Sequence, residues 1–318
     1  MAHEIESMAY VGATPWHGLG NQLTPRQSID VWMTEAGMDW QIESSDVLFN
    51  AGGETELRIK PFADNKVLFR SDTLAPLSVV SKRYQIVQPR EVLAFYRDLV
   101  AVGGFALETA GVLKGGRKFW ALARTGQALR LQGNDEVKGY LLLATSCDGT
   151  LATTAQFTSV RVVCNNTLQV AVAHPGGAVK VPHSTQFDPA VVKQSLGIGL
   201  SAWDRFSAEI HRLAARPVNA SEAHRFLIDV LGDADLPLTQ QPNPRALQTV
   251  MSLFEGKGRG SELVSAQGTA WGLLNGVTEF VDHHRKARNQ DFRLDSAWFG
   301  HGAALKERAY QAAMRLAA

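Results

Sequence analysis

Cysteine is scarce in this chain of 318 residues, which has only Cys147 and Cys164. Two cysteines cannot form the set of disulfides that stabilises small secreted domains, nor a four-cysteine zinc site. Cys164 follows the apolar residues Val160, Val162 and Val163, a pattern that favours a buried and unreactive thiol.

Long hydrophobic runs are also missing. A charge or a glycine interrupts every apolar run within about 18 residues, and mean hydropathy is -0.10, so no transmembrane helix is expected. The first six residues lack the basic and apolar regions of a secretory signal. We therefore expect a cytoplasmic protein that does not contact a membrane.

The overall charge is close to zero, but it is unevenly distributed. Hydrophobic residues make up 45% and charged residues 20%, which is ordinary for a globular protein and excludes a mainly disordered chain. The formal net charge of +1 conceals a segment of −6 over residues 1–60 and a segment of +6 over residues 61–130. This separation indicates a basic surface for an anionic partner, or two parts that attract each other.

Turn signals and alternating residues predict an antiparallel α+β core. A helix opened by Pro89 stands between β-rich segments, and a glycine turn near residue 115 separates two alternating runs. We expect β-hairpins around this central helix. The predicted elements are a loop over 1–25, a helix capped by Thr24 that runs to about residue 36, strands over 40–70 and 77–80, a helix over 89–103, and hairpins over 105–123 and 140–163.

Beyond residue 176 the periodicity becomes helical. Helices are expected at 189–215, 221–231, 244–254, 268–288 and 303–316. We therefore predict two domains, an α+β core over 1–175 and a mostly helical C-terminal region over 176–318.

The signatures of common enzymes are missing from the chain. It has no Gly-x-Ser-x-Gly elbow, no His-Glu-x-x-His helix and no Walker motif. Residues 256–261 combine three glycines with two cations, and their backbone amides could hold a phosphate. Because no predicted strand precedes this segment, a flexible basic loop is the favoured interpretation, and no cofactor is expected.

Histidines suggest two further hypotheses. Asp282, His283 and His284 could bind a metal, but adjacent side chains on a helix point about 100° apart, so a solvated helix face is favoured and no metal is predicted. His17 beside Trp16 could serve an enzyme of an unrecognised type, although a histidine held in a glycine-rich turn is the simpler interpretation.

Cations interleaved with aromatic residues give the strongest functional pattern. The span 109–134 has five bases and no acid. Cations neutralise phosphates and aromatic faces stack on bases, whereas in a strand at least one of Phe119 and Trp120 must face the core. The residues expected to bind single-stranded nucleic acid are Lys82, Arg83, Tyr84, Arg117, Lys118, Trp120, Arg161, Asn165 and Asn166.

Several of these segments resemble one known family. Residues 14–20, 78–91, 116–123 and 160–168 resemble the phage/plasmid-like proteins of the DUF932 family, and residues 268–283 are similar to its longer subgroup. This resemblance implies residence on phages, plasmids and integrated elements.

The predicted helix between hairpins is similar in outline to the Rad52-like annealing proteins that phages encode. That similarity implies a mobile-element protein that binds single-stranded DNA and promotes strand annealing without nucleotide hydrolysis. The helical C-terminal half would mediate self-association or partner docking. Two alternatives stay open, an interaction protein that engages host machinery through the acidic segment 1–60, and an enzyme that uses His17.

Overall fold

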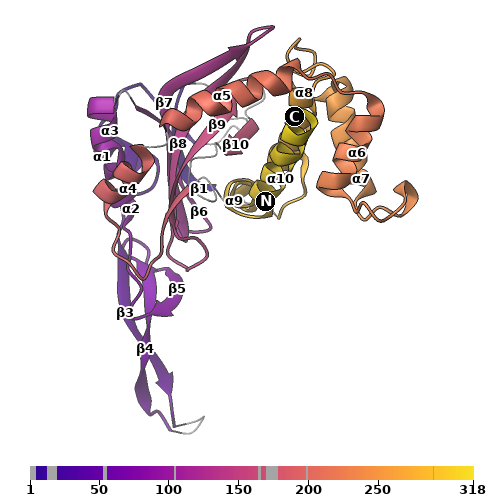
Figure 1. The fold of residues 1–318 in the computed structure, drawn as a ribbon. Helices are drawn as coiled ribbons and strands as arrows, with labels where there is room; N and C mark the ends of the chain where they lie inside the picture. Colours follow the sequence, from indigo (N-terminus) through magenta and orange to yellow (C-terminus); the bar gives the residue numbers. More distant parts are fainter. Residues whose placement is uncertain are drawn as a thin grey trace. The chain divides into compact units, whose positions relative to one another are not determined.

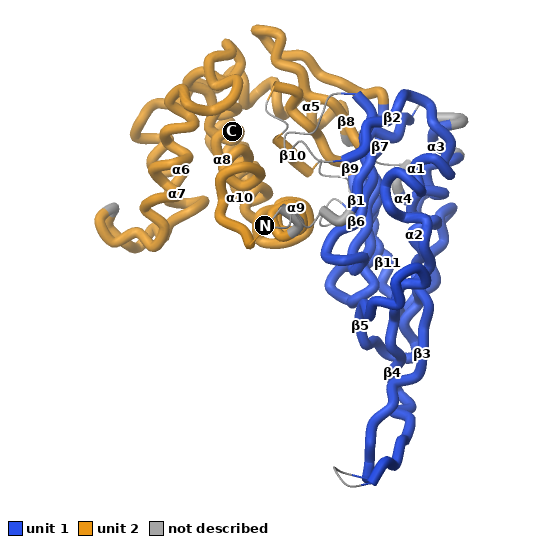
Figure 2. The backbone as a smooth tube through the Cα atoms, turned by 180° about the vertical axis from the view of Figure 1, so that it is seen from behind, with its two compact units in different colours: residues 1–125, 141–156, 178–196 blue, residues 126–140, 157–177, 197–318 orange. Residues whose placement is uncertain are grey.

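The computed structural model describes residues 5–12, 20–52, 56–103, 105–163, 166–169, 178–197, 200–288 and 290–318. They divide into two compact units, coloured separately in Figure 2. Unit 1 comprises residues 1–125, 141–156 and 178–196, and unit 2 comprises residues 126–140, 157–177 and 197–318.

One large sheet contributes strands to both units. Its members are β1 (Ile5–Val11), β2 (Asn21–Leu23), β6 (Ala106–Leu113), β7 (Lys118–Leu131), β8 (Asp135–Ser146), β9 (Thr153–Arg161), β10 (Asn166–Gln169) and β11 (Ala178–Val181). Their spatial order is β10-β9-β8-β7-β6-β1-β2, with β11 also paired to β9. β1 runs antiparallel to β6 and parallel to β2. The hairpins predicted from the sequence therefore form a single sheet.

Helices of unit 1 pack on this sheet. They are α1 (Ile29–Glu35), α2 (Pro89–Ala94), α3 (Tyr96–Gly103) and α4 (Pro189–Gly197). Tyr96, the first residue of α3, is fully buried. Its hydroxyl lies 2.9 Å from the Ala121 carbonyl and 3.0 Å from the Leu141 carbonyl, so the start of α3 is held against the backbones of β7 and β8. Phe187, just before α4, packs against Phe95 between α2 and α3, with ring centroids 6.3 Å apart. This contact holds α4 against those two helices.

A second, smaller sheet in unit 1 has the order β3-β4-β5. Its strands are β3 (Ile42–Asn50), β4 (Ile59–Arg70) and β5 (Pro76–Ser81). β5 pairs only with residues 65–69 of β4, so the outer part of the sheet is a two-stranded ribbon. Figure 1 shows this ribbon projecting from the rest of unit 1. We call residues 47–52 and 56–62 the arm.

Helices make up most of unit 2. They are α5 (Leu200–Ala215), α6 (Ala220–Leu231), the short 3-10 helix η1 (Leu238–Gln240), α7 (Pro244–Ser252), α8 (Ala270–Glu279), α9 (Gln290–Phe299) and α10 (His301–Leu316). The π-helical turns η2 (Leu253–Lys257) and η3 (Phe280–His284) continue α7 and α8. Every residue of α8 is buried, so α8 is the central helix of this unit. Within the described residues, no helix is long and apolar enough to cross a membrane.

The predicted α+β class, with antiparallel pairing and a helical C-terminal part, is confirmed. Two expectations differ from the structure. Residues 5–11 form β1 instead of a loop, because pairing with β6 supplies backbone hydrogen bonds that local sequence signals do not show. The units also do not separate at residue 175, since 126–140 and 157–169 contribute to unit 2 while α4 belongs to unit 1.

Candidate functional site

Three chain segments meet at one end of the sheet in unit 1, and we call residues 82–85, 114–118 and 146–151 the turn cluster. The Tyr84 hydroxyl donates to the Ser146 carbonyl at 2.8 Å. One residue further along, the Cys147 amide donates to the Arg117 carbonyl at 2.8 Å. The loops that carry Arg83 and Arg117 are thus fastened to adjacent residues of the turn between β8 and β9.

The β6–β7 turn in this cluster requires a left-handed backbone. Lys114, Gly115 and Gly116 have φ angles of 56°, 67° and 92°, and glycine adopts such values without the steric penalty of a side chain. The two glycines therefore allow the chain to reverse immediately before Arg117 and Lys118.

The cations of the turn cluster differ in accessibility. Arg83 and Arg117 are exposed, whereas Lys118 is only 5% exposed. The exposed Lys82 ammonium pairs with Asp46 of β3. In sequence the cluster contains five cations, Lys82, Arg83, Lys114, Arg117 and Lys118, against one carboxylate, Asp148.

The aromatic member of the cluster, Tyr84, is half-buried and already stacked. Its ring lies 4.4 Å from that of His183, at an interplanar angle of 18°. The two His183 nitrogens lie 3.1 Å from the Gln85 carbonyl and 3.0 Å from the Leu151 carbonyl. His183 therefore covers one face of Tyr84 and is held in place by the segments on either side.

Two titratable groups in the β8–β9 turn have shifted pKa values. Burial raises the pKa of the Cys147 thiol to about 12, which makes it unreactive near neutral pH. Partial burial would raise the pKa of Asp148, but hydrogen bonds from the Thr150 hydroxyl and amide outweigh this effect and lower it. Asp148 is consequently a carboxylate that stabilises its own turn.

Trp120 does not reach the surface of the turn cluster. It is 2% exposed, and its neighbour Phe119 is fully buried, so both side chains belong to the core. Strand alternation had predicted that at least one of Phe119 and Trp120 faces the core, and the structure buries both. Base stacking on Trp120 is excluded by this burial, because no polynucleotide can reach the ring.

Arg161 and Asn166 belong to a buried polar core in unit 2. The Arg161 guanidinium forms two bonds with the Asp135 carboxylate, Nε to Oδ1 at 2.7 Å and Nη2 to Oδ2 at 2.8 Å. The Ser265 hydroxyl and the Trp271 indole also donate to Asp135, at 2.7 and 3.0 Å. Asp135 is fully buried and Arg161 is 2% exposed, so this arginine holds the fold together instead of contacting solvent.

A second buried network lies beside β10. Lys306 of α10 donates to the Asp282 carboxylate at 2.8 Å and to the Thr167 hydroxyl at 2.6 Å. Asp282 also accepts from the Thr167 amide at 2.8 Å, while the Asn166 amide group donates to the Asn275 carbonyl at 3.3 Å. Every charge in this network has a partner, which is the arrangement expected of a structural site.

The nine sequence-predicted residues therefore separate into groups. Lys82, Arg83, Tyr84, Arg117 and Lys118 come together in the turn cluster, whereas Trp120, Arg161 and Asn166 are buried elsewhere. Asn165, like His17 and Cys164, lies outside the described residues.

Sequence reasoning missed Asp135 and Lys306, two charged partners of the polar core. It also placed Asp282 on a solvated helix face, whereas Asp282 is buried and paired with Lys306. The available signal was an acid at the start of a strand and a lysine on the apolar face of a helix.

The glycine-rich loop at residues 256–261, which the sequence suggested could bind phosphate, binds the carboxylate of Glu279 instead. The Arg259 amide donates to the buried Glu279 carboxylate at 3.0 Å, and the Gly258 amide donates to the Leu253 carbonyl at 2.9 Å. These backbone donors are engaged by unit 2 itself, so this loop is not proposed as a phosphate site.

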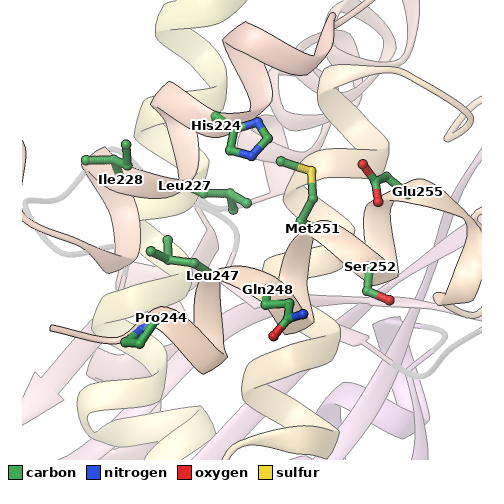
Figure 3. A pocket seen from close by; sticks show the side chains of 9 residues that line it. All are labelled: His224, Leu227, Ile228, Pro244, Leu247, Gln248, Met251, Ser252 and Glu255. Carbon is green, nitrogen blue, oxygen red and sulfur yellow. The ribbon is translucent and has the colours of Figure 1, made fainter. Parts of the chain in front are cut away.

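Unit 2 also carries an open pocket of about 440 Å³ between α6 and α7 (Figure 3). Leu227, Ile228 and Leu247 give it an apolar wall, and Figure 3 shows Met251 directed toward His224. Among the described residues, no group of three or more histidine, cysteine or acidic side chains could hold a metal ion.

Fold and site together define a mixed α+β protein with a cationic turn cluster at one end of its sheet and a buried polar core among its helices. Residues 76–298 match the profile described as "Domain of unknown function (DUF932)", and because this match covers more than half of the chain, the protein belongs to the DUF932 family. No curated protein and no solved structure matches the chain. The resembling segments 78–91, 116–123 and 160–168 lie within the matched range, and segment 14–20 lies before it.

Proposed function

We propose that this DUF932 protein binds single-stranded nucleic acid through the turn cluster. The observation that carries the proposal is the convergence of cations from distant parts of the chain on the β8–β9 turn, with Asp148 as the single carboxylate of the cluster. Clustered cations attract the phosphate backbone and release its counterions, whatever the sequence of the strand.

The exposed guanidiniums of Arg83 and Arg117 are the proposed phosphate contacts. Lys82 joins them when phosphate displaces the Asp46 carboxylate from their exposed pair, which is a weak competitor because both side chains are hydrated. Lys118 acts from beneath the surface, since its charge contributes to the electrostatic potential even though the side chain is buried.

Stacking has a smaller part in this proposal than the sequence suggested. Tyr84 already stacks on His183 with one face, so phosphate contacts provide most of the binding energy. Binding is therefore strongly salt-dependent and tolerant of base sequence. We further propose that the protein belongs to the phage/plasmid-like branch of its family and promotes annealing of complementary strands in the manner of Rad52-like proteins, without nucleotide hydrolysis.

The decisive experiment is a titration of a labelled oligothymidine at several salt concentrations. Arg83→Ala with Arg117→Ala removes two phosphate contacts, and we expect log K to depend less steeply on log salt by about 1.4, at roughly 0.7 per contact for single strands. The matched control, Arg130→Ala with Arg315→Ala, removes two exposed cations elsewhere, with side chains 82% and 64% exposed, and should leave the slope unchanged.

Equal slopes for wild type and the cluster variant would refute the proposal, as would binding that ignores salt. Annealing is measured separately, from the rate at which two labelled complementary strands pair. An unchanged pairing rate in the presence of saturating protein would exclude the annealing role and leave only binding.

A further inference from the structure

The arm exposes more apolar surface than an isolated ribbon can support. Residues 47–50 of β3 pair with residues 59–62 of β4, and in the part of the chain that the structure describes no third strand pairs with this part of the small sheet. A two-stranded ribbon is marginally stable in water unless something packs against it. The arm nevertheless holds regular pairing up to the hydrogen bond from the Ala51 amide to the Arg58 carbonyl, at 2.8 Å.

Both faces of the arm are mostly apolar, with Lys60 as the polar member of the paired residues on one face and Asn50 on the other. Val47 lies opposite Phe62, and Phe49 lies two residues further along on that same face. The other face carries Leu48 opposite Pro61, and Ile59 beside it. The exposed fractions are 59% for Leu48, 46% for Phe49, 50% for Ile59, 48% for Phe62 and 82% for Leu57. A ribbon that only extended into solvent would keep at least one polar face.

We propose that a second copy of this chain covers the arm, so that two arms associate into a dimer. Charge favours this occupant over a polyanion or a strongly charged protein. Residues 47–62 contain two acids, Glu54 and Glu56, and two bases, Arg58 and Lys60, so the segment is neutral. Glu56 and Arg58 also pair with each other at 3.1 Å.

The two edges of the arm differ in how well they can pair with another strand. Pro61 lacks an amide hydrogen and interrupts the outer edge of β4. Residues 47–50 of β3 contain no proline and no charge, and among the described residues no further strand pairs with the β3 edge. Two β3 edges can therefore pair antiparallel about a twofold axis without placing like charges opposite each other.

The exposed area is at the lower limit for such a dimer. The five apolar side chains expose on the order of 500 Å² per chain, so about 1,000 Å² is the upper bound on the apolar area that two associated arms remove from water, close to the smallest specific protein interfaces. We therefore expect a reversible dimer with a micromolar dissociation constant.

Sedimentation velocity of the full chain, treated with nuclease, tests this inference. Wild type should form dimers over a micromolar concentration range. Phe49→Glu with Phe62→Glu should weaken dimerisation by about a hundredfold or more, because it places four carboxylates in the apolar contact. The matched control is Val191→Glu, at a position on α4 that is 57% exposed and should leave the dimer intact.

A second variant tests edge pairing and does not depend on the charge change. Leu48→Pro removes an amide that faces the outer edge of β3, because Leu48 and Pro61 form a pair that is not hydrogen-bonded within the ribbon. It should abolish the dimer while far-ultraviolet circular dichroism stays unchanged.

The inference would be overturned by a wild-type chain that stays monomeric, or by a dimer that survives both sets of substitutions. If the wild-type chain is monomeric, the arm variants are also tested for binding to the oligonucleotide and to host proteins, and a loss of either would overturn the inference as well. The last result would assign the arm to a different partner.

Discussion

Arg161 and Asp135 form a buried, bidentate ion pair inside unit 2, with Nε–Oδ1 and Nη2–Oδ2 distances of 2.7 and 2.8 Å. Arg161 also donates to the Gly260 carbonyl at 3.0 Å, while Ser265 and Trp271 complete the partners of Asp135. The pair therefore ties β8 and β9 to the loop that precedes α8. This relationship explains why a basic residue in the 160–168 motif contributes to stability and not to a surface.

Asp135→Asn should destabilise unit 2 by about 3–5 kcal/mol, because it leaves the Arg161 charge buried without its counterion. The measurement is the free energy of unfolding in urea. Asp229→Asn is the control, since it breaks an exposed pair with Arg315 and should cost about 0–1 kcal/mol. Equal losses for the two variants would show that the buried pair has no special role.

Gly272→Ala should also destabilise unit 2, although alanine favours a helix interior by about 1 kcal/mol. A Cβ at Gly272 would lie 1.8 Å from the Ala266 carbonyl oxygen, so α8 or the preceding loop must move, at a cost of about 1–3 kcal/mol. A Cβ at Gly276 in the same helix would lie 3.3 Å from its nearest atom, so Gly276→Ala should lower the free energy of unfolding by less. A Gly272→Ala variant that equals wild type in urea midpoint would contradict this close approach.

Cys147 should resist alkylation in the native protein. In a Cys164→Ser background, iodoacetamide at pH 8 should label Cys147 only after unfolding, because a pKa of about 12 leaves roughly one thiolate in ten thousand and the thiol is buried.

Since folding raises the pKa of Cys147, its contribution to stability is fully present below the pKa of the unfolded thiol, near 9, and is lost as pH rises toward 12. Cys147→Ala removes this dependence and is the control. Native labelling at the rate of an unfolded peptide would disprove the assigned burial.

Local patterns predicted most of the elements. Pro89 opens α2 as expected, and the glycine turn at residues 115–116 separates β6 from β7. Some boundaries moved by a few residues, as at α1, which is capped by Ser28 instead of Thr24. These features depend on residues close in sequence, so turn chemistry and periodicity were sufficient to find them.

The sequence by itself determined the α+β class, the family membership and the excess of cations over residues 61–130. Only the tertiary structure decided which of the cations expected to bind nucleic acid are accessible. Arg83 and Arg117 remain exposed, whereas Arg161 is buried against Asp135, a residue 26 positions away. The physical reason is that the desolvation and pairing of a charge depend on neighbours brought together by folding, and composition does not contain that information.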